Sequence, residues 1–220
     1  MRSEDPEQLI NSYSPLEEKL NVVSHAIGLL LSAIGLALLI VRAWNSDDGL
    51  YLISFVIFGA SMVLLYAAST FYHNCKQPPL RYKLKILDHA SIYVLIAGTY
   101  TPFTLITLKG NGGWILFAIV WSLAFLGIIL KLFFTGRFKI VSTAMYVLMG
   151  WVMIFAINPM MENLPLNGLY WVLAGGISYT LGAVLYSISR IRFNHAIFHL
   201  FVLIGTFCHF VSVYRYVLPA

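Results

Sequence analysis

Charged residues are scarce in this sequence. Asp, Glu, Lys and Arg together make up only 10% of the 220 residues, whereas 60% are hydrophobic. Ordinary soluble domains contain about 25% charged residues, because most of their surface faces water. The composition therefore excludes a soluble globular protein and indicates a chain that uses the lipid bilayer as its solvent.

Cysteine is nearly absent as well. The chain has only Cys75, in a connector between apolar runs, and Cys208, deep in the last apolar run. Two distant cysteines without a CxxC pair provide neither a disulfide framework nor a cysteine-based metal site. We expect both to be free thiols.

A continuous basic face is also missing, although the formal net charge is +5. Lys and Arg lie in short connectors between apolar runs, where membrane topology accounts for them better than nucleic-acid binding does. No nucleic-acid partner is therefore expected.

The sequence contains several long apolar runs. A run of about 20 residues, at a helical rise of about 1.5 Å per residue, crosses a hydrocarbon layer of about 30 Å. We predict an all-α, polytopic membrane protein with seven transmembrane helices. Pro102 predicts a kink in the third helix, and Asn158-Pro159 is expected to end the fifth. The predicted helices cover residues 21–41, 50–71, 86–108, 114–134, 140–157, 169–188 and 195–217.

A polar segment of mixed charge, residues 1–20, precedes the first apolar run. It has no signal-peptide pattern, so we interpret it as a cytoplasmic segment and residues 21–217 as the transmembrane domain. All but three of the 14 Lys and Arg residues, the exceptions being Arg42, Lys109 and Arg215, fall on the side of the N-terminus. This bias predicts a cytoplasmic N-terminus and an outside C-terminus. We expect a multi-pass protein of the cell inner (plasma) membrane with membrane lipids as partners.

Ionisable residues gather at one predicted depth. His73 ends the second apolar run, and His195 and His199 open the seventh, all at the predicted cytoplasmic face. His195 and His199 are four residues apart, which places both imidazoles on one helical face where they can share a metal ion. With His73 as third ligand, three neutral imidazoles make an open tetrahedral zinc site of the catalytic kind.

Asp88 and Ser69 are the predicted catalytic residues of this site. Asp88 opens the third run at the same depth and can hold the reacting water or orient a ligand. Ser69 lies one turn before His73 and can bond its imidazole or the substrate. The alternative is that interfacial histidines only hydrogen-bond to headgroups or neighbouring helices. The three histidine ligands also do not distinguish zinc from other metals that accept imidazole ligands.

Further polar residues have no settled role. Glu18, Asn21 and His25 share one face of the first helix at the same end and can buttress the site, although Asn21 and Glu18 also suit a helix start. His209 follows His199 by ten residues, or about 15 Å along a helix, which is too far to share the metal. It is expected to make an interhelical hydrogen bond.

Taken together, these segments resemble the hemolysin III family, the bacterial branch of the progestin and adipoQ receptor superfamily. The likeness extends from about Glu17 to about Tyr216. It rests on EEKLN at 17–21 followed by SH at 24–25, ASTFYH at 68–73, LDH at 87–89, AGTYTPF at 97–103, NHAIFH at 194–199 and CHF at 208–210.

The resemblance implies seven helices, zinc bound by His73, His195 and His199, and Asp88 near the bound water. It also links the chain to membrane lipid homeostasis and, through receptor relatives, to hydrolysis of lipid amides. The leading hypothesis is a zinc-dependent hydrolase of lipid amide or ester bonds. Alternatives are a non-catalytic sensor or receptor with a structural zinc, or a hemolysin-like cytolytic protein, although no run of charges lines a path through the membrane midplane. The lipid and the oligomeric state are left open.

Overall fold

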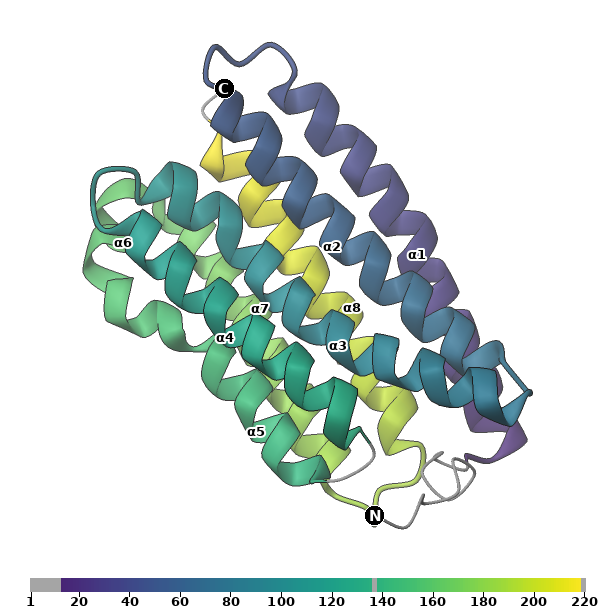
Figure 1. Cartoon of the computed structure of the whole chain (residues 1–220). Coiled ribbons are helices and arrows are strands. Elements are labelled where there is room, and N and C mark those ends of the chain that lie inside the picture. The colour runs from purple at the N-terminus through teal and green to yellow at the C-terminus, as the bar shows by residue number, and fades with distance from the viewer. Residues whose placement is uncertain (1–12, 136–137, 219–220) are drawn as a thin grey trace.

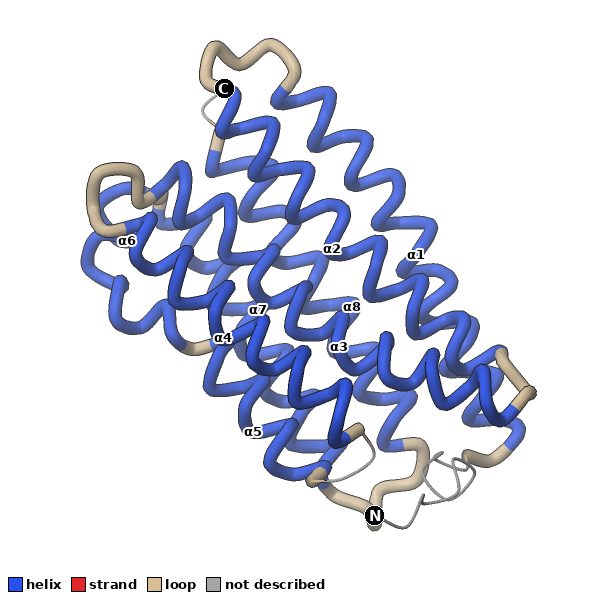
Figure 2. The backbone as a smooth tube through the Cα atoms, in the orientation of Figure 1, coloured by secondary structure: helices blue, strands red, loops and turns tan. Residues whose placement is uncertain are grey.

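The computed structural model describes residues 13–135 and 138–218, and in these ranges the chain forms helices joined by short connections, without a strand (Figures 1 and 2). The predicted segment 1–20 therefore lies largely outside the described residues. The helices are α1 (Pro15–Ala43), α2 (Gly49–Asn74), α3 (Pro78–Pro102), α4 (Gly113–Phe134), α5 (Lys139–Gly150), α6 (Ile157–Asn163), α7 (Leu166–Ser187) and α8 (Asn194–Ser212).

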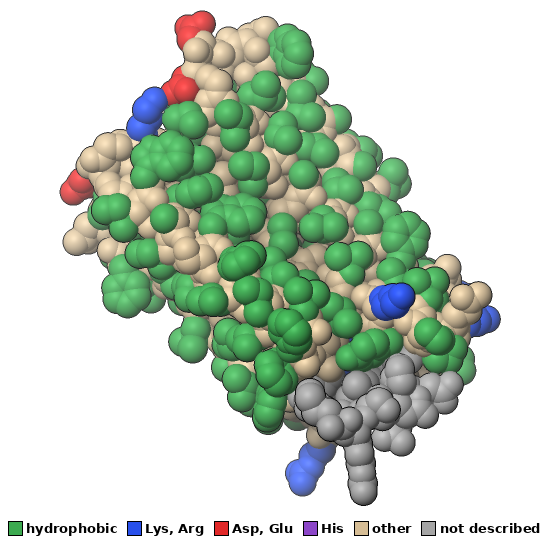
Figure 3. All heavy atoms as spheres, in the orientation of Figure 1, with side chains coloured by type: hydrophobic (Ala, Val, Ile, Leu, Met, Phe, Trp, Pro, Cys, Tyr) green, Lys and Arg blue, Asp and Glu red, His purple; other side chains and the backbone are tan. Residues whose placement is uncertain are grey.

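Seven helical stretches of the described chain are long and apolar enough to cross a membrane. One of them, Ile140–Asn163, is composite: it contains α5, a 3₁₀ turn over Val152–Ala156, and α6. Large apolar side chains cover the visible outer face of the bundle (Figure 3). Such a surface is stable against hydrocarbon, and helices satisfy their backbone amides internally. The predicted all-α, seven-helix membrane protein is confirmed; which end faces the cytoplasm stays a prediction.

Two helices begin earlier than the apolar runs suggest. Ser14 caps α1 by accepting a hydrogen bond from the Glu17 amide at 3.2 Å, and a proline occupies the first turn. Similarly, α3 begins at Pro78 and not at residue 86. Its first turns therefore include Arg81, Lys83 and Lys85, which the sequence placed in a connector.

The third span changes its winding directly after Pro102. A π-helical turn covers Phe103–Thr107, and the amide of Leu108 donates to the carbonyl of Phe103 at 2.8 Å. Proline has no amide hydrogen and its ring crowds the preceding turn, so a widened turn is the expected accommodation. Asn158-Pro159, in contrast, does not end the fifth span, because both residues lie inside α6.

Helix α3 is the most buried span and lies between α2 and α4 (Figure 1). Small residues let its neighbours approach closely. A Cβ atom on Gly98 would lie 2.3 Å from the Ser61 hydroxyl of α2, and one on Gly127 of α4 would lie 2.3 Å from the Tyr93 ring. Van der Waals packing at small residues is a main source of helix association in membranes. This packing fixes α3 between α2 and α4.

The start of α4 provides a test of this packing. A Cβ atom on Gly113 would lie 1.9 Å from the carbonyl oxygen of Thr104 and 2.7 Å from that of Leu108, and neither backbone atom can rotate away. We expect Gly113→Ala to destabilise the protein by about 1–3 kcal/mol, the usual range for overpacking. Thermal unfolding in detergent measures this as a lower midpoint. The control is Gly150→Ala, where nothing lies within 4 Å; equal midpoints for the two variants would contradict the packing argument.

Candidate metal centre

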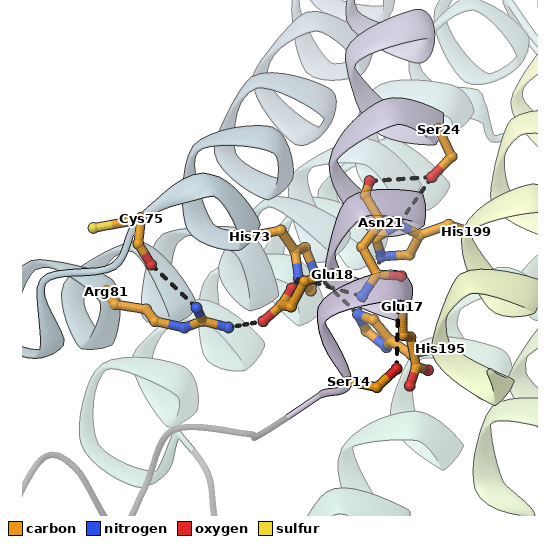
Figure 4. A network of polar contacts seen from close by, with 10 residues as sticks. All are labelled: Ser14, Glu17, Glu18, Asn21, Ser24, His73, Cys75, Arg81, His195 and His199. Carbon is orange, nitrogen blue, oxygen red and sulfur yellow. Dashed lines mark hydrogen bonds and ion pairs between the residues drawn. The ribbon is translucent and has the colours of Figure 1, made fainter. Parts of the chain in front are cut away.

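Three histidine side chains converge where the C-terminal end of α2 meets the N-terminal end of α8 (Figure 4). The Nε2 atom of His195 lies 3.1 Å from Nε2 of His73 and 3.1 Å from Nε2 of His199. All three residues are buried, and their ligand atoms lie within 4.8 Å of one another. They are the single group of this kind among the described residues.

This geometry fits a bound metal ion. Zinc–nitrogen bonds of about 2.0–2.1 Å in a tetrahedron place neighbouring nitrogens about 3.3 Å apart, close to the two observed separations. Hydrogen bonds alone satisfy the group poorly, because each neutral imidazole has one donor and one acceptor nitrogen. The Nε2 atom of His195 faces two other Nε2 atoms and cannot form a good hydrogen bond with both. A metal ion accepts all three lone pairs at once.

A carboxylate fixes the orientation of His73. Oxygen Oε2 of Glu18 lies 2.7 Å from Nδ1 of His73, and the other carboxylate oxygen forms an ion pair with Arg81. When Nδ1 donates its proton to Glu18, Nε2 is left with the lone pair that binds metal. Arg81 also donates to the backbone oxygen of Cys75 at 3.1 Å and lies over the Tyr72 ring. Helices α1, α2 and α3 are thereby joined beside the centre.

The other polar residues of α1 also face the histidines. The Asn21 amide lies 3.4 Å from Nδ1 of His73, and the Ser24 hydroxyl lies 3.4 Å from Nδ1 of His199. The His25 ring stacks on His199 with centroids 3.5 Å apart and an angle of 10° between the planes. Glu18, Asn21 and His25, whose role the sequence left open, therefore all contact the cluster. The face that they share predicts this placement.

Asp88 lines a cavity of about 480 Å³ together with His25, His195 and His199. The carboxyl is buried and lies within electrostatic range of His73. Ser69 is buried beside Asp88 but forms no hydrogen bond of good geometry and does not line the cavity. The structure therefore places Asp88 where a bound molecule can reach it. The predicted role of Ser69 stays a prediction.

Most of the cavity wall is apolar and comes from α3, α5, α7 and α8. Leu95 and Ile96 contribute from α3, Val147 from α5, and Leu169 and Val172 from α7. Apolar pockets with a few convergent polar groups are the usual form of small-molecule sites. His195, His199 and Asp88 are among the polar groups at one end of this cavity.

His209 lies deeper in α8 and, as expected, is not part of the cluster. Its ring stacks on Tyr179 at 5.4 Å, and the absence of a side chain on Gly175 makes room for it. His89 also lines the cavity. Since α3 begins eight residues earlier than predicted, this position is already inside the bundle.

Several site residues were missed by the sequence reasoning. Lys85 and Lys131 were interpreted as topological charges, yet both are buried and line the cavity. Tyr13, which precedes α1, stacks on the His195 ring with centroids 4.8 Å apart. Lys85 lies one helical turn before Asp88, a spacing that could have identified it. No pattern in the sequence indicates that Tyr13 covers the cluster.

The Glu18 contact gives a testable consequence. Glu18→Gln removes the charged acceptor of the His73 proton, so we expect zinc affinity to fall by about 10–100-fold, the usual effect of losing such a partner. Competition with a zinc chelator measures the affinity on purified protein. Glu162→Gln, an exposed residue at the end of α6, is the matched control. Unchanged zinc affinity in Glu18→Gln would mean that Glu18 serves only its ion pair with Arg81.

Comparisons with known proteins agree with the motifs. A family model described as Haemolysin-III related matches residues 13–210. Hemolysin-3 of Bacillus cereus is 48% identical over 203 residues, 92% of this chain and 93% of that protein. The Hemolysin-3 homolog of Bacillus subtilis (strain 168) is 46% identical over 200 residues, 91% and 94% of the two chains. Monocyte to macrophage differentiation factor of Homo sapiens is 29% identical over 206 residues, which are 91% of this chain and 84% of that protein. With seven apolar spans and a match over most of its length, this chain belongs to the haemolysin-III-related family of multi-pass membrane proteins.

Proposed function

We propose that the protein is a zinc-dependent hydrolase that cleaves an amide or ester bond of a membrane lipid and so influences membrane lipid composition. The observation that carries this proposal is the convergence of three imidazole nitrogens beside a buried carboxylate at one end of an apolar cavity. Three neutral imidazoles leave the fourth tetrahedral position open, as in catalytic zinc sites. A zinc ion held there supplies Lewis-acid chemistry, polarising the lipid carbonyl and acidifying water.

The residues around the cluster have separate tasks in this proposal. Glu18 holds the proton of His73 on Nδ1, so that Nε2 presents its lone pair. Asp88 accepts the proton of the attacking water at a carboxylate oxygen and returns it to the leaving group, the usual role of a general base. The apolar wall binds the acyl chain and excludes water from the reacting bond. The predicted topology places this chemistry at the cytoplasmic face of the inner membrane.

Metal content and turnover together test the proposal. We expect purified protein to contain about one zinc per chain, and His73→Ala, His195→Ala and His199→Ala each to lose it. His209→Ala, a buried histidine outside the cluster, is the control and should retain zinc. Asp88→Asn should also retain zinc but lower the rate of lipid cleavage by about 10²–10⁴-fold. The substrate screen is a broad membrane lipid extract, with release of fatty acid as the readout.

One outcome would favour a non-catalytic sensor with a structural metal. The ligands come from the ends of α2 and α8, so a metal ion would also fasten these two helices together. Protein that holds zinc, cleaves no lipid amide or ester, and loses thermal stability in His199→Ala would support that function and reject the hydrolase. Leakage of liposomes at low protein density would instead support lysis, which the name of the Bacillus cereus relative suggests.

A further inference from the structure

Tyr13 contacts the histidine cluster on a side that does not belong to the cavity. Its ring stacks on His195 with centroids 4.8 Å apart and an angle of 19° between the planes. The centroid of Tyr13 also lies 5.7 Å from that of the His73 ring. Neither Tyr13 nor His73 lines the cavity, whereas His195 and His199 do. The cluster therefore has one side toward the cavity and another that Tyr13 covers.

Tyr13 differs from the other rings around the cluster in its place in the chain. The further aromatic side chains that contact the clustered histidines are His25, Tyr72, Tyr186 and Phe198. All four belong to helices (α1, α2, α7 and α8), where backbone hydrogen bonds hold them. Tyr13, in contrast, precedes α1 and its cap. Segments outside helices open at a lower free-energy cost than helix interiors, so Tyr13 is the ring that moves most easily.

Access to the cluster requires such a movement. His73, His195 and His199 are each at most 5% exposed, so an ion or a water molecule reaches them only when a neighbouring group is displaced. An ion that entered through the cavity would pass a mostly apolar wall and lose its hydration at high cost. The chain around Tyr13 is polar instead, because the next residue, Ser14, is exposed and the start of α1 carries charged side chains (Figure 4). Tyr13 itself is partly exposed.

We propose that Tyr13 is a movable cover of the histidine cluster, and that metal ions and water reach the centre past its ring and not through the lipid cavity. As the route for the water consumed in hydrolysis, this rests on the proposed function. As a cover of the histidines, it requires neither a metal ion nor hydrolysis. Separate routes allow the cavity to hold a lipid while water or a metal ion is exchanged on the other side.

Chemical modification of zinc-free protein tests the cover without a metal ion. The probe is diethyl pyrocarbonate, which acylates neutral imidazoles, and mass spectrometry of peptides gives the rate at each histidine. We expect His73 and His195 to react about 2–10-fold faster in Tyr13→Ala than in the unmodified protein, the usual effect of losing an aromatic pair. His209, buried elsewhere in α8, is the internal reference. Unchanged rates at His73 and His195 would overturn the proposal.

Tyr13→Phe separates the ring from its hydroxyl group. This variant keeps the stacked ring, so both histidines should react at the rate of the unmodified protein. If Tyr13→Phe reacted as fast as Tyr13→Ala, the protection would depend on a bond of the hydroxyl, and the stacked cover would be rejected.

The rate of zinc release into excess chelator tests the route. Phe198→Ala is the matched control on the cavity side, because Phe198 lines the cavity and its ring centroid lies 6.1 Å from that of His195. We expect Tyr13→Ala to release zinc about 2–10-fold faster than the unmodified protein, and Phe198→Ala to change the rate less. Release from Phe198→Ala that is as fast as from Tyr13→Ala would place the route in the cavity and contradict the proposal.

A neighbouring variant separates the cover from fraying of the helix end. Leu16→Ala changes an exposed residue in the first turn of α1 and should leave the modification rates unchanged. Equally fast modification in Leu16→Ala and Tyr13→Ala, with a lower unfolding midpoint in both, would mean that the end of α1 has opened and would reject the cover. Protein without zinc would reject the proposed hydrolase, while the modification rates would still decide on Tyr13. Zinc-dependent hydrolysis with unchanged rates in Tyr13→Ala would reject the cover alone.

Discussion

Hydrocarbon offers no hydrogen-bond partner, and the arrangement of polar groups in this protein follows from that constraint. Helices satisfy the backbone amides, and buried polar side chains bond to one another or to backbone oxygens. Several of the contacts between side chains lie together at one end of the bundle. Glu18 contacts His73 and Arg81, and Lys131 contacts Ser142. The candidate centre is therefore also the place where α1 through α5 and α8 are joined by polar contacts.

The number and class of the helices followed from apolar length alone, because a bilayer demands spans of nearly fixed length. The ends of the helices did not. Apolar length marks the part of a helix that suits hydrocarbon, whereas α1 and α3 begin with proline turns that precede their apolar runs, at Pro15 and Pro78. Pro102 predicted a kink, and the structure shows a π-helical turn directly after it, a change of winding that the sequence does not specify.

The sequence likewise predicts some residues of the candidate site and misses others. Spacing places His195 and His199 on one face, and depth brings His73 to the same layer, so the cluster could be inferred from the sequence. Lys85 and Lys131 could not be recognised by counting charges, since the positive-inside rule considers the side of the membrane and ignores burial. Ser69 shares a helix face with His73 but is not among the residues that line the cavity, and its part in the site stays a prediction. Residues on one helical face can contact different neighbours, which the sequence does not specify.

The separation of the three clustered histidines along the chain has a consequence for biosynthesis. His195 follows His73 by 122 residues, and its helix, α8, is the last span of the described chain to enter the membrane. During synthesis, His73 is already in place while five further spans are inserted, and the three imidazoles meet only when α8 docks. A metal ion held by all three imidazoles would therefore be acquired late. Metal loading at this step would distinguish fully assembled molecules from truncated or misinserted ones.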